Sequence, residues 1–376
     1  MVHFSKNNIT LSFVGDIALG EHPLCIGHGL LRVVEERGCA FIFQAVKPYL
    51  QQSQITFGNL EYAILKRLSS SHLAKSKNFC PQECLEEICH AGFDILNLAN
   101  NHIMEHGEKA AKATMKYLFN SGIKFCGIHS GNPQLSEIVT ITCHHMTIGF
   151  LGYSLRPRQF FKGNPIYSEG DYDRILTDIE DSKKKVNILI VSLHWGDEFI
   201  QKPSPQEILN ARSMIDAGAN IIVGHHPHVV RGIEVYKGGI IAYSLGNFIC
   251  DMSWEERLIE TMILQVHISE DCNITFDIIP CKIDEYFRPV LLEGLEADKL
   301  KQKIIGFGKG LNGYNIRDLD KEQRLYELES KRQLKLNQMS SRMYFLKHLN
   351  DYPAGIVCEH FILFLKNRFQ EWFSRV

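Results

Sequence analysis

The chain has 376 residues, of which 45% are hydrophobic, and its formal net charge at pH 7 is −2. A chain of this length buries a large core, and its near-neutral charge supplies no basic field for phosphates, so we expect no nucleic-acid partner. No apolar run approaches the roughly 18 residues that cross a bilayer, and residues 1–8 lack the apolar centre of a signal peptide. We therefore expect a cytoplasmic protein with no integral membrane segment.

Apolar, strand-like segments of the first two-thirds of the chain run directly into polar residues. The polar residues are Asp16 after residues 9–14, Asn59 and Glu61 after 55–58, Asn101 and His102 after 95–99, His194 after 186–193, and His225, His226 and His228 after 221–223. In open α/β sheets, ligands bind outside the carboxyl ends of the strands. We therefore expect these side chains to converge on one site.

The residue types at these strand ends predict a metal site. The predicted ligands are carboxylate oxygens of Asp16 and Glu61, the amide oxygen of Asn101, and imidazole nitrogens of His194, His226 and His228. Such a mixture suits Mn, Fe or Zn, bound as one ion or as two ions about 3.5–4 Å apart. We expect His102 to act as a general acid beside Asp16 and Asn101, because a histidine near metals exchanges protons close to neutral pH.

The eleven cysteines give no regular pattern of pairs. In a long chain without a signal segment, we expect reduced thiols rather than a disulfide framework. Cys80, Cys84 and Cys89 lack the Cys-x2-Cys spacing of zinc ribbons, so we do not expect structural zinc there.

Two β-hairpins are predicted further along the chain, one over residues 137–153 and one around Gly238-Gly239. Between them, Arg156 and Arg158 follow a predicted strand end, and Arg231 stands three residues after His228. Guanidinium groups pair well with phosphate and carboxylate. We therefore predict that these arginines bind an anionic small molecule or polymer, the alternative being a solvated loop.

After about residue 285 the composition becomes typical of helices. We predict a sheet domain over residues 1–285 and a helical extension over 286–376, with helices over Asp318–Leu346 and Ile356–Trp372. Their apolar faces require a partner surface. That surface is either the sheet domain or a second copy of the chain, which would make a homo-oligomer through the C-terminal helices.

Six ordered blocks carry a resemblance to a known family. They are Phe13–Gly20, Gly58–Glu61, Asn97–His102, His194–Glu198, Gly224–Val230 and Tyr243–Phe248. In these blocks the chain resembles the capsule synthesis protein CapA family, which is associated with poly-γ-glutamate production and has a metallophosphoesterase (calcineurin-like) fold. The resemblance implies an α/β sandwich of mixed sheets with flanking helices, metal ligands at one end, and hydrolase chemistry by metal-activated water.

Residues around the predicted ligands are expected to orient them. These are Asn59, Glu105, Glu198, His225 and Asn247. The chain has Glu105 where the family usually has aspartate, and it lacks the Asp-x-His of ordinary metallophosphoesterases, because Ile17 and Ala18 follow Asp16. Three functions stay open: phosphoester hydrolysis, γ-glutamyl amide hydrolysis, and a non-catalytic role in polymer binding or assembly.

Overall fold

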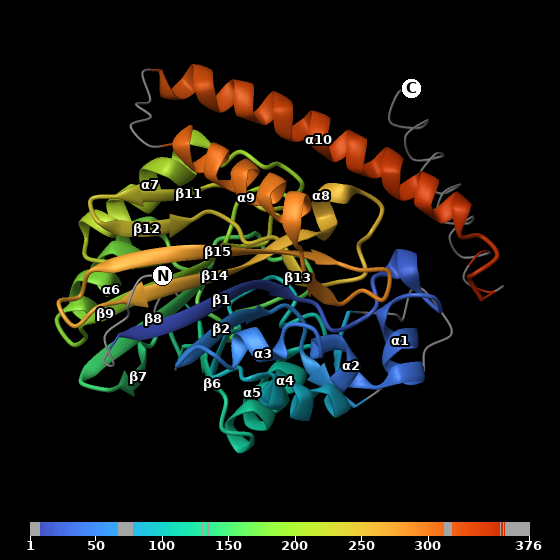
Figure 1. Cartoon of the computed structure of the whole chain (residues 1–376), viewed down its shortest axis with the longest axis horizontal. Helices are drawn as coiled ribbons and strands as arrows, with labels where there is room; N and C mark the ends of the chain where they lie inside the picture. Colours follow the sequence, from blue (N-terminus) through green and yellow to red (C-terminus); the bar gives the residue numbers. More distant parts are fainter. Residues whose placement is uncertain are drawn as a thin grey trace.

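The computed structural model describes residues 8–66, 78–129, 131–133, 136–311, 318–353, 355 and 357. Its largest sheet contains eight strands (Figure 1). They are β1 (Ile9–Ile17), β2 (Ile55–Leu60), β5 (Ile95–Asn97), β6 (Lys124–Cys126), β13 (Asn247–Ile249), β14 (Glu260–Ile268), β15 (Ile274–Ile283) and β16 (Pro289–Leu291). The strand order is β16-β15-β14-β1-β2-β5-β6, and β13 also pairs with β1. The sheet is mixed, because β1 runs parallel to β2 and β13 but antiparallel to β14.

A second, six-stranded sheet has the order β11-β12-β10-β9-β8-β7. Its strands are β7 (Val139–Cys143), β8 (Met146–Ser154), β9 (Ile188–His194), β10 (Ile221–His225), β11 (Ile233–Tyr236) and β12 (Gly239–Ala242). The antiparallel pairs β7–β8 and β11–β12 confirm both predicted hairpins. A small separate ladder joins β3 (Ile64–Leu65) to β4 (Cys80–Pro81).

Apolar side chains from both sheets form the central core. Phe13 and Phe57 from the first sheet meet Phe150, Ile190 and Val223 from the second, and all five are fully buried. The rings of Phe57 and Phe150 are nearly parallel, with centroids 5.8 Å apart. Burying large aromatic side chains on both inner faces holds the sheets together as a sandwich.

Helices cover the two outer faces. The first sheet is covered by α1 (Leu30–Arg37), α2 (Cys39–Phe43), α3 (Lys47–Leu50), α4 (Leu85–Ala91) and α5 (Glu108–Asn120), and the second by α6 (Tyr172–Lys183) and α7 (Pro205–Asp216). Short turns of helix occur at η1 (Pro23–Cys25), η3 (Gln82–Cys84) and α8 (Glu256–Ile259). The predicted α/β sandwich of mixed sheets with flanking helices is therefore confirmed.

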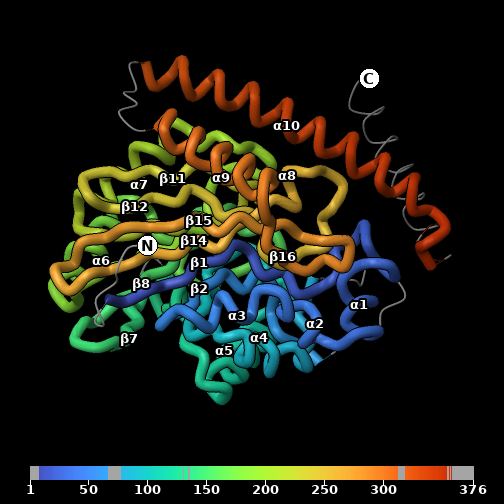
Figure 2. Tube along the Cα trace, viewed as in Figure 1, coloured from blue at the N-terminus to red at the C-terminus, as the bar shows by residue number. Residues whose placement is uncertain are grey.

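Two longer helices follow the sheets. Leu300 and Ile304 of α9 (Gly294–Lys309) reach the core between the sheets. The next helix, α10 (Leu319–Lys347), packs against α7 and runs along the top of the molecule in the view of Figures 1 and 2. It begins at Asp318, whose side chain accepts the Lys321 N–H, and it confirms the predicted helix over Asp318–Leu346.

The predicted helix over Ile356–Trp372 lies, apart from Val357, outside the described residues, and the boundary at residue 285 stays a prediction. Strand β16, which follows that boundary, is paired with β15 in the first sheet. Among the residues that the structure describes, no helix is both long and apolar enough to cross a membrane.

The prediction of reduced thiols is wrong for one pair of cysteines. Cys39, at the start of α2, forms a disulfide with Cys84 in η3, and their Cα atoms are 5.2 Å apart. The pair is 45 residues apart in sequence and meets only because α2 and α4 pack side by side on the first sheet. Cys84 is therefore not available as a zinc ligand. The other described cysteines carry free thiols.

Candidate metal centre

Strand register brings the predicted residues to one end of the sandwich. In the first sheet, Asp16 of β1 lies beside Asn59 of β2 and Asn247 of β13. In the second sheet, His194 and His225 are paired as the last residues of β9 and β10. The carboxyl ends of parallel strands from both sheets therefore supply side chains to one place, as the strand-end rule predicts.

Gly15 allows this close packing at the tip of β1. A Cβ atom at this position would lie 1.9 Å from the Gly246 carbonyl oxygen, which is too close for any side chain. The same carbonyl accepts the Asp16 N–H at 3.0 Å. The backbone contact fixes where the Asp16 carboxylate points.

The first ligand group comprises Asp16, Glu61 and His194. All three side chains are buried, and one ligand atom from each lies within 4.8 Å of the others. The Asn59 amide donates to Asp16 Oδ1 at 2.9 Å and to Glu61 Oε2 at 2.6 Å, so it holds both carboxylates. His194 Nε2 lies 2.8 Å from Asn101 Oδ1 and 3.6 Å from Glu61 Oε1. Asn101 therefore lies beside this group, in contact with His194.

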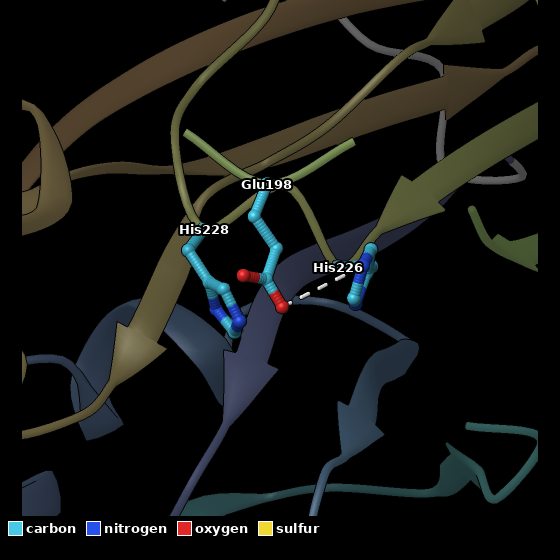
Figure 3. Close-up of side chains that lie close together, drawn as sticks. All are labelled: Glu198, His226 and His228. Carbon is cyan, nitrogen blue, oxygen red and sulfur yellow. Dashed lines mark ion pairs between the residues drawn. The ribbon is translucent and has the colours of Figure 1, made fainter. Parts of the chain in front are cut away.

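The second ligand group comprises Glu198, His226 and His228. Figure 3 shows the Glu198 carboxylate directed between the two imidazoles, and one ligand atom from each residue lies within 4.8 Å of the others. Glu198 Oε1 is 3.9 Å from His226 Nε2. Glu198 was expected only to orient a ligand, and this geometry makes it a candidate ligand itself. His226 N–H donates to Asp16 Oδ2 at 3.1 Å, which joins the two groups.

The loop after β10 holds its histidines in an unusual backbone conformation. His226 has φ 95° and His228 has φ 59°, values that residues other than glycine rarely adopt. Such conformations cost about 1–3 kcal/mol each and concentrate at functional sites. Asn247 Oδ1 lies 2.8 Å from His228 Nδ1 and fixes that ring. The backbone conformation that directs both imidazoles into the site therefore lowers the stability of the folded state.

Several polar atoms of the site are buried without a hydrogen-bond partner. These are Glu61 Oε1, His194 Nδ1 and both ring nitrogens of His226. An unsatisfied buried polar atom costs about 1–3 kcal/mol, so a cluster of them calls for a ligand. Carboxylate oxygens with imidazole nitrogens are a donor set that fits a divalent cation.

Burial and neighbouring charge shift the pKa values at the site. Burial raises the pKa of Glu61 well above its usual range, and the Asp16 charge adds to this rise. Burial lowers the pKa of His194 and of His226, which favours neutral imidazole, the form that binds metals. Burial also acts to raise the pKa of Asp16, but the hydrogen bond and charge of His225 outweigh it, so this pKa lies below its usual range.

His102 lies beside the first ligand group. Its Nδ1 is 2.9 Å from Glu105 Oε2, and its Nε2 is 3.9 Å from Glu61 Oε1. The ring of Phe160, which is partly exposed, stacks on His102 with centroids 4.6 Å apart. Glu105, which was expected to orient a metal ligand, thus contacts His102 instead, and His102 sits between the buried ligands and solvent.

The three arginines predicted to bind substrate have different surroundings. Arg156 donates through Nη1 to the Gly196 carbonyl, beside the Glu198 loop, and is mostly buried. Arg158 instead forms an ion pair with Glu169 on the surface, with Nε 2.6 Å from Oε1. Of these two, only Arg156 is adjacent to a ligand group.

Arg231 is fully buried and has its donors occupied. Its guanidinium donates to the Ile200 carbonyl at 2.8 Å, to Glu207 Oε1 at 2.7 Å and to the Asp197 carbonyl at 3.0 Å. A side chain in this setting has no donor directed to solvent, so the predicted substrate contact does not fit its position. Arg231 supports the loop that carries Glu198.

Sequence reasoning missed several residues of the network. Asn97 Nδ2 donates to Asn59 Oδ1 at 3.0 Å, and Asn100 Nδ2 donates to the Leu60 carbonyl at 2.8 Å. Both asparagines stand in the same block as Asn101, and that proximity was the available signal. Gln159, which accepts from Asn101 at 3.3 Å, gave no signal in the sequence.

The bacterial capsule synthesis protein PGA_cap family model matches residues 10–252 of this chain. Capsule biosynthesis protein CapA of Bacillus anthracis is 31% identical over 312 residues, which cover 80% of this chain and 74% of that protein. PGA biosynthesis protein CapA of Bacillus subtilis (strain 168) is 32% identical over 307 residues, covering 80% and 78%. A solved structure of a putative 5'-nucleotidase from Staphylococcus aureus is 15% identical, with a TM-score of 0.47 over 79% of this chain and 58% of that one. The chain belongs to the bacterial capsule synthesis protein PGA_cap family, whose CapA members are related to capsule and polyglutamate synthesis.

Proposed function

We propose that this protein is a metal-dependent hydrolase that acts on an anionic substrate during capsule or poly-γ-glutamate synthesis. The observation that carries the proposal is the pair of neighbouring ligand groups, each made of carboxylate and imidazole side chains. Both groups contain buried polar atoms that have no hydrogen-bond partner. A protein that only bound a polymer would gain nothing from burying these atoms, because each costs free energy until a ligand satisfies it.

Six residues are assigned as ligands of one or two divalent ions, with Mn, Fe or Zn as the candidates. They are Asp16, Glu61, Asn101, His194, His226 and His228, and Glu198 joins them as a seventh donor. When bound, such an ion supplies Lewis-acid stabilisation of negative charge on oxygen and activates water. Asn59, His225 and Asn247 hold the ligands in place through the contacts described above.

Side chains around the ligands are proposed to deliver the proton and to bind the substrate. In phosphoester hydrolysis, water gives up a proton to solvent and its oxygen forms a bond to phosphorus, the bond to the leaving oxygen breaks, and that oxygen takes up a proton. Glu105 accepts the Nδ1–H of His102, which leaves Nε2 as the atom that delivers this proton. Arg156, beside the Glu198 loop, supplies positive charge for the anionic substrate.

A non-catalytic polymer-binding or assembly role is the second candidate. It is favoured by one sequence feature: Ile17 and Ala18 follow Asp16, where ordinary metallophosphoesterases have an Asp-x-His pair. A chain that has lost a ligand of this kind can keep the fold and lose turnover.

Turnover measurements separate the two candidates. Protein loaded with Mn²⁺, Fe²⁺ or Zn²⁺ would be assayed on bis(p-nitrophenyl) phosphate and on poly-γ-glutamate, and we expect hydrolysis of at least one. Asp16→Ala is expected to abolish that hydrolysis. His267→Gln is the matched control, because His267 pairs with Thr10 at the opposite end of β1. Equal hydrolysis rates for the parent and Asp16→Ala would contradict the catalytic assignment.

We also propose that copies of the chain associate through the outer face of α10. Exposed apolar side chains recur along α10 at helical spacing, to one side of the buried Tyr326. They are Leu325, Leu328, Leu336, Met339, Met343 and Leu346. Single apolar residues scattered over a surface are ordinary, but a row of them along one helix indicates an interaction surface, which a second copy of the chain would cover.

A further inference from the structure

Arginine side chains hold the loop that follows β9. This loop, residues 196–200, carries Glu198, and four of its five carbonyl oxygens accept hydrogen bonds from three arginines. The pairs are Arg156 with Gly196, Arg231 with Asp197 at 3.0 Å and with Ile200 at 2.8 Å, and Arg257 with Phe199 at 2.9 Å. We call Arg156, Arg231 and Arg257 the arginine clamp.

The clamped loop is strained. The strained residue is Phe199, whose φ of 65° lies in the left-handed region that favours glycine. Gly196 has φ 79°, which glycine adopts without strain. A Cβ atom at Gly196 would also lie 2.3 Å from Glu207 Oε1. A conformation of this kind persists only when its surroundings hold it, because relaxation would lower the backbone energy. The arginine clamp supplies that restraint.

The restraint is anchored in separate parts of the fold. Arg156 follows β8, Arg231 follows β10, and Arg257 lies in α8. Ser330 of α10 adds a side-chain contact, since its hydroxyl lies 3.1 Å from Asp197 Oδ2. The Phe199 N–H also donates to the Pro227 carbonyl at 2.9 Å, which ties the loop to the segment between the two histidines of the second ligand group.

We propose that the arginine clamp positions Glu198, so that its carboxylate faces His226 and His228. The inference rests on the proposed metal site, because Glu198 has a ligand role only if that site binds an ion. In this role the three arginines are positioning residues, because they contact backbone carbonyls and act through Glu198; Arg156 has this role in addition to the positive charge that it is proposed to supply to the substrate. Lysine is a poor substitute, because the guanidinium fork fixes the direction of its donors and a lysine ammonium does not.

Arg257 is the member best suited to substitution. Its side chain is 23% exposed, and it pairs with Glu255 in addition to its bond to Phe199. Arg288→Met is a matched control, because Arg288 is 21% exposed and pairs with Asp284, remote from the loop in sequence and contacts. Arg231 is less suitable, because its removal leaves Glu207 buried without its partner.

The test measures Mn²⁺ affinity by titration calorimetry and amide hydrogen exchange of residues 196–200. We expect Arg257→Met to weaken Mn²⁺ binding about tenfold or more, as loss of residues that orient ligands does, and to speed exchange of the loop. Arg257→Lys should fall between Arg257→Met and the parent. Arg288→Met should match the parent in both measurements, and Glu198→Gln should weaken binding without speeding loop exchange.

The outcomes separate the clamp from the metal site. If the parent and Glu198→Gln behave as expected but Arg257→Met keeps parental Mn²⁺ affinity, the positioning role is overturned and the metal site stands. Unchanged loop exchange in Arg257→Met overturns it as well. If the parent binds none of Mn²⁺, Fe²⁺ and Zn²⁺, the metal site and the positioning role are both overturned.

Discussion

Asp251 should make the stability of this protein depend on pH. The residue follows β13, is buried, and accepts the His22 N–H at 3.1 Å and the Leu30 N–H at 3.4 Å at the start of α1. Burial raises the pKa of Asp251 from its ordinary value of 3.8 to about 7, although the two backbone donors act in the opposite direction. The folded protein therefore keeps this carboxyl protonated where the unfolded chain ionises it.

The sign and size of this pH dependence follow from the number of protons that each state binds. Between pH 3.8 and about pH 7, the folded state binds more protons at Asp251 than the unfolded state does. The free energy of unfolding therefore falls as pH rises through this window and levels off above it. At about 1.36 kcal/mol per unit, the whole difference is about 4 kcal/mol, of which about 3 kcal/mol lies above pH 5.

The variant Asp251→Asn tests this directly, because an amide does not titrate and its oxygen still accepts a backbone N–H. Urea unfolding of both proteins would be followed from about pH 5 to about pH 8. We expect the free energy of unfolding of the variant, minus that of the parent, to rise by about 3 kcal/mol over this range. A difference that stays constant across the range would refute the reasoning.

Three further changes have defined outcomes. His102→Gln is expected to lower kcat about 10²–10⁴-fold and leave metal content unchanged, because His102 delivers a proton and is not a ligand; parental kcat would contradict this role. Leu328→Glu with Met339→Glu should lower the sedimentation coefficient by dissociating copies that meet through α10, and a monomeric parent would rule that contact out. Phe150→Ala should lower the free energy of unfolding by about 3–5 kcal/mol, because it opens a cavity between the sheets; a loss below about 1 kcal/mol would place Phe150 outside the core.

The sequence predicted the parts of the site that follow from strand periodicity. Asp16, Glu61, His194 and His226 all stand at or just after the ends of apolar strands, and the carboxyl ends of parallel strands meet at one edge. Their convergence needs only the strand pattern and that rule. The hairpin around Gly238-Gly239 was predictable for the same reason, since its turn signal is local.

Contacts between distant segments were not predictable in this way. Arg231 stands in the exposed-looking stretch after the histidines, yet it is buried because Glu207 of α7 and the carbonyls of residues 196–200 surround it. The Cys39–Cys84 disulfide likewise depends on two helices meeting on the first sheet. Such contacts are set by packing geometry, which residue spacing along the chain does not contain.

Metal analysis tests the central claim most directly. The purified parent and a His226→Ala/His228→Ala variant would be reconstituted with Mn²⁺, Fe²⁺ or Zn²⁺, and their metal content measured by plasma mass spectrometry. We predict about one to two equivalents in the parent, as the two ligand groups require, and a loss of at least one equivalent in the variant. A parent without metal after reconstitution, or a variant with the parental metal content, would contradict the assignment of these histidines as ligands.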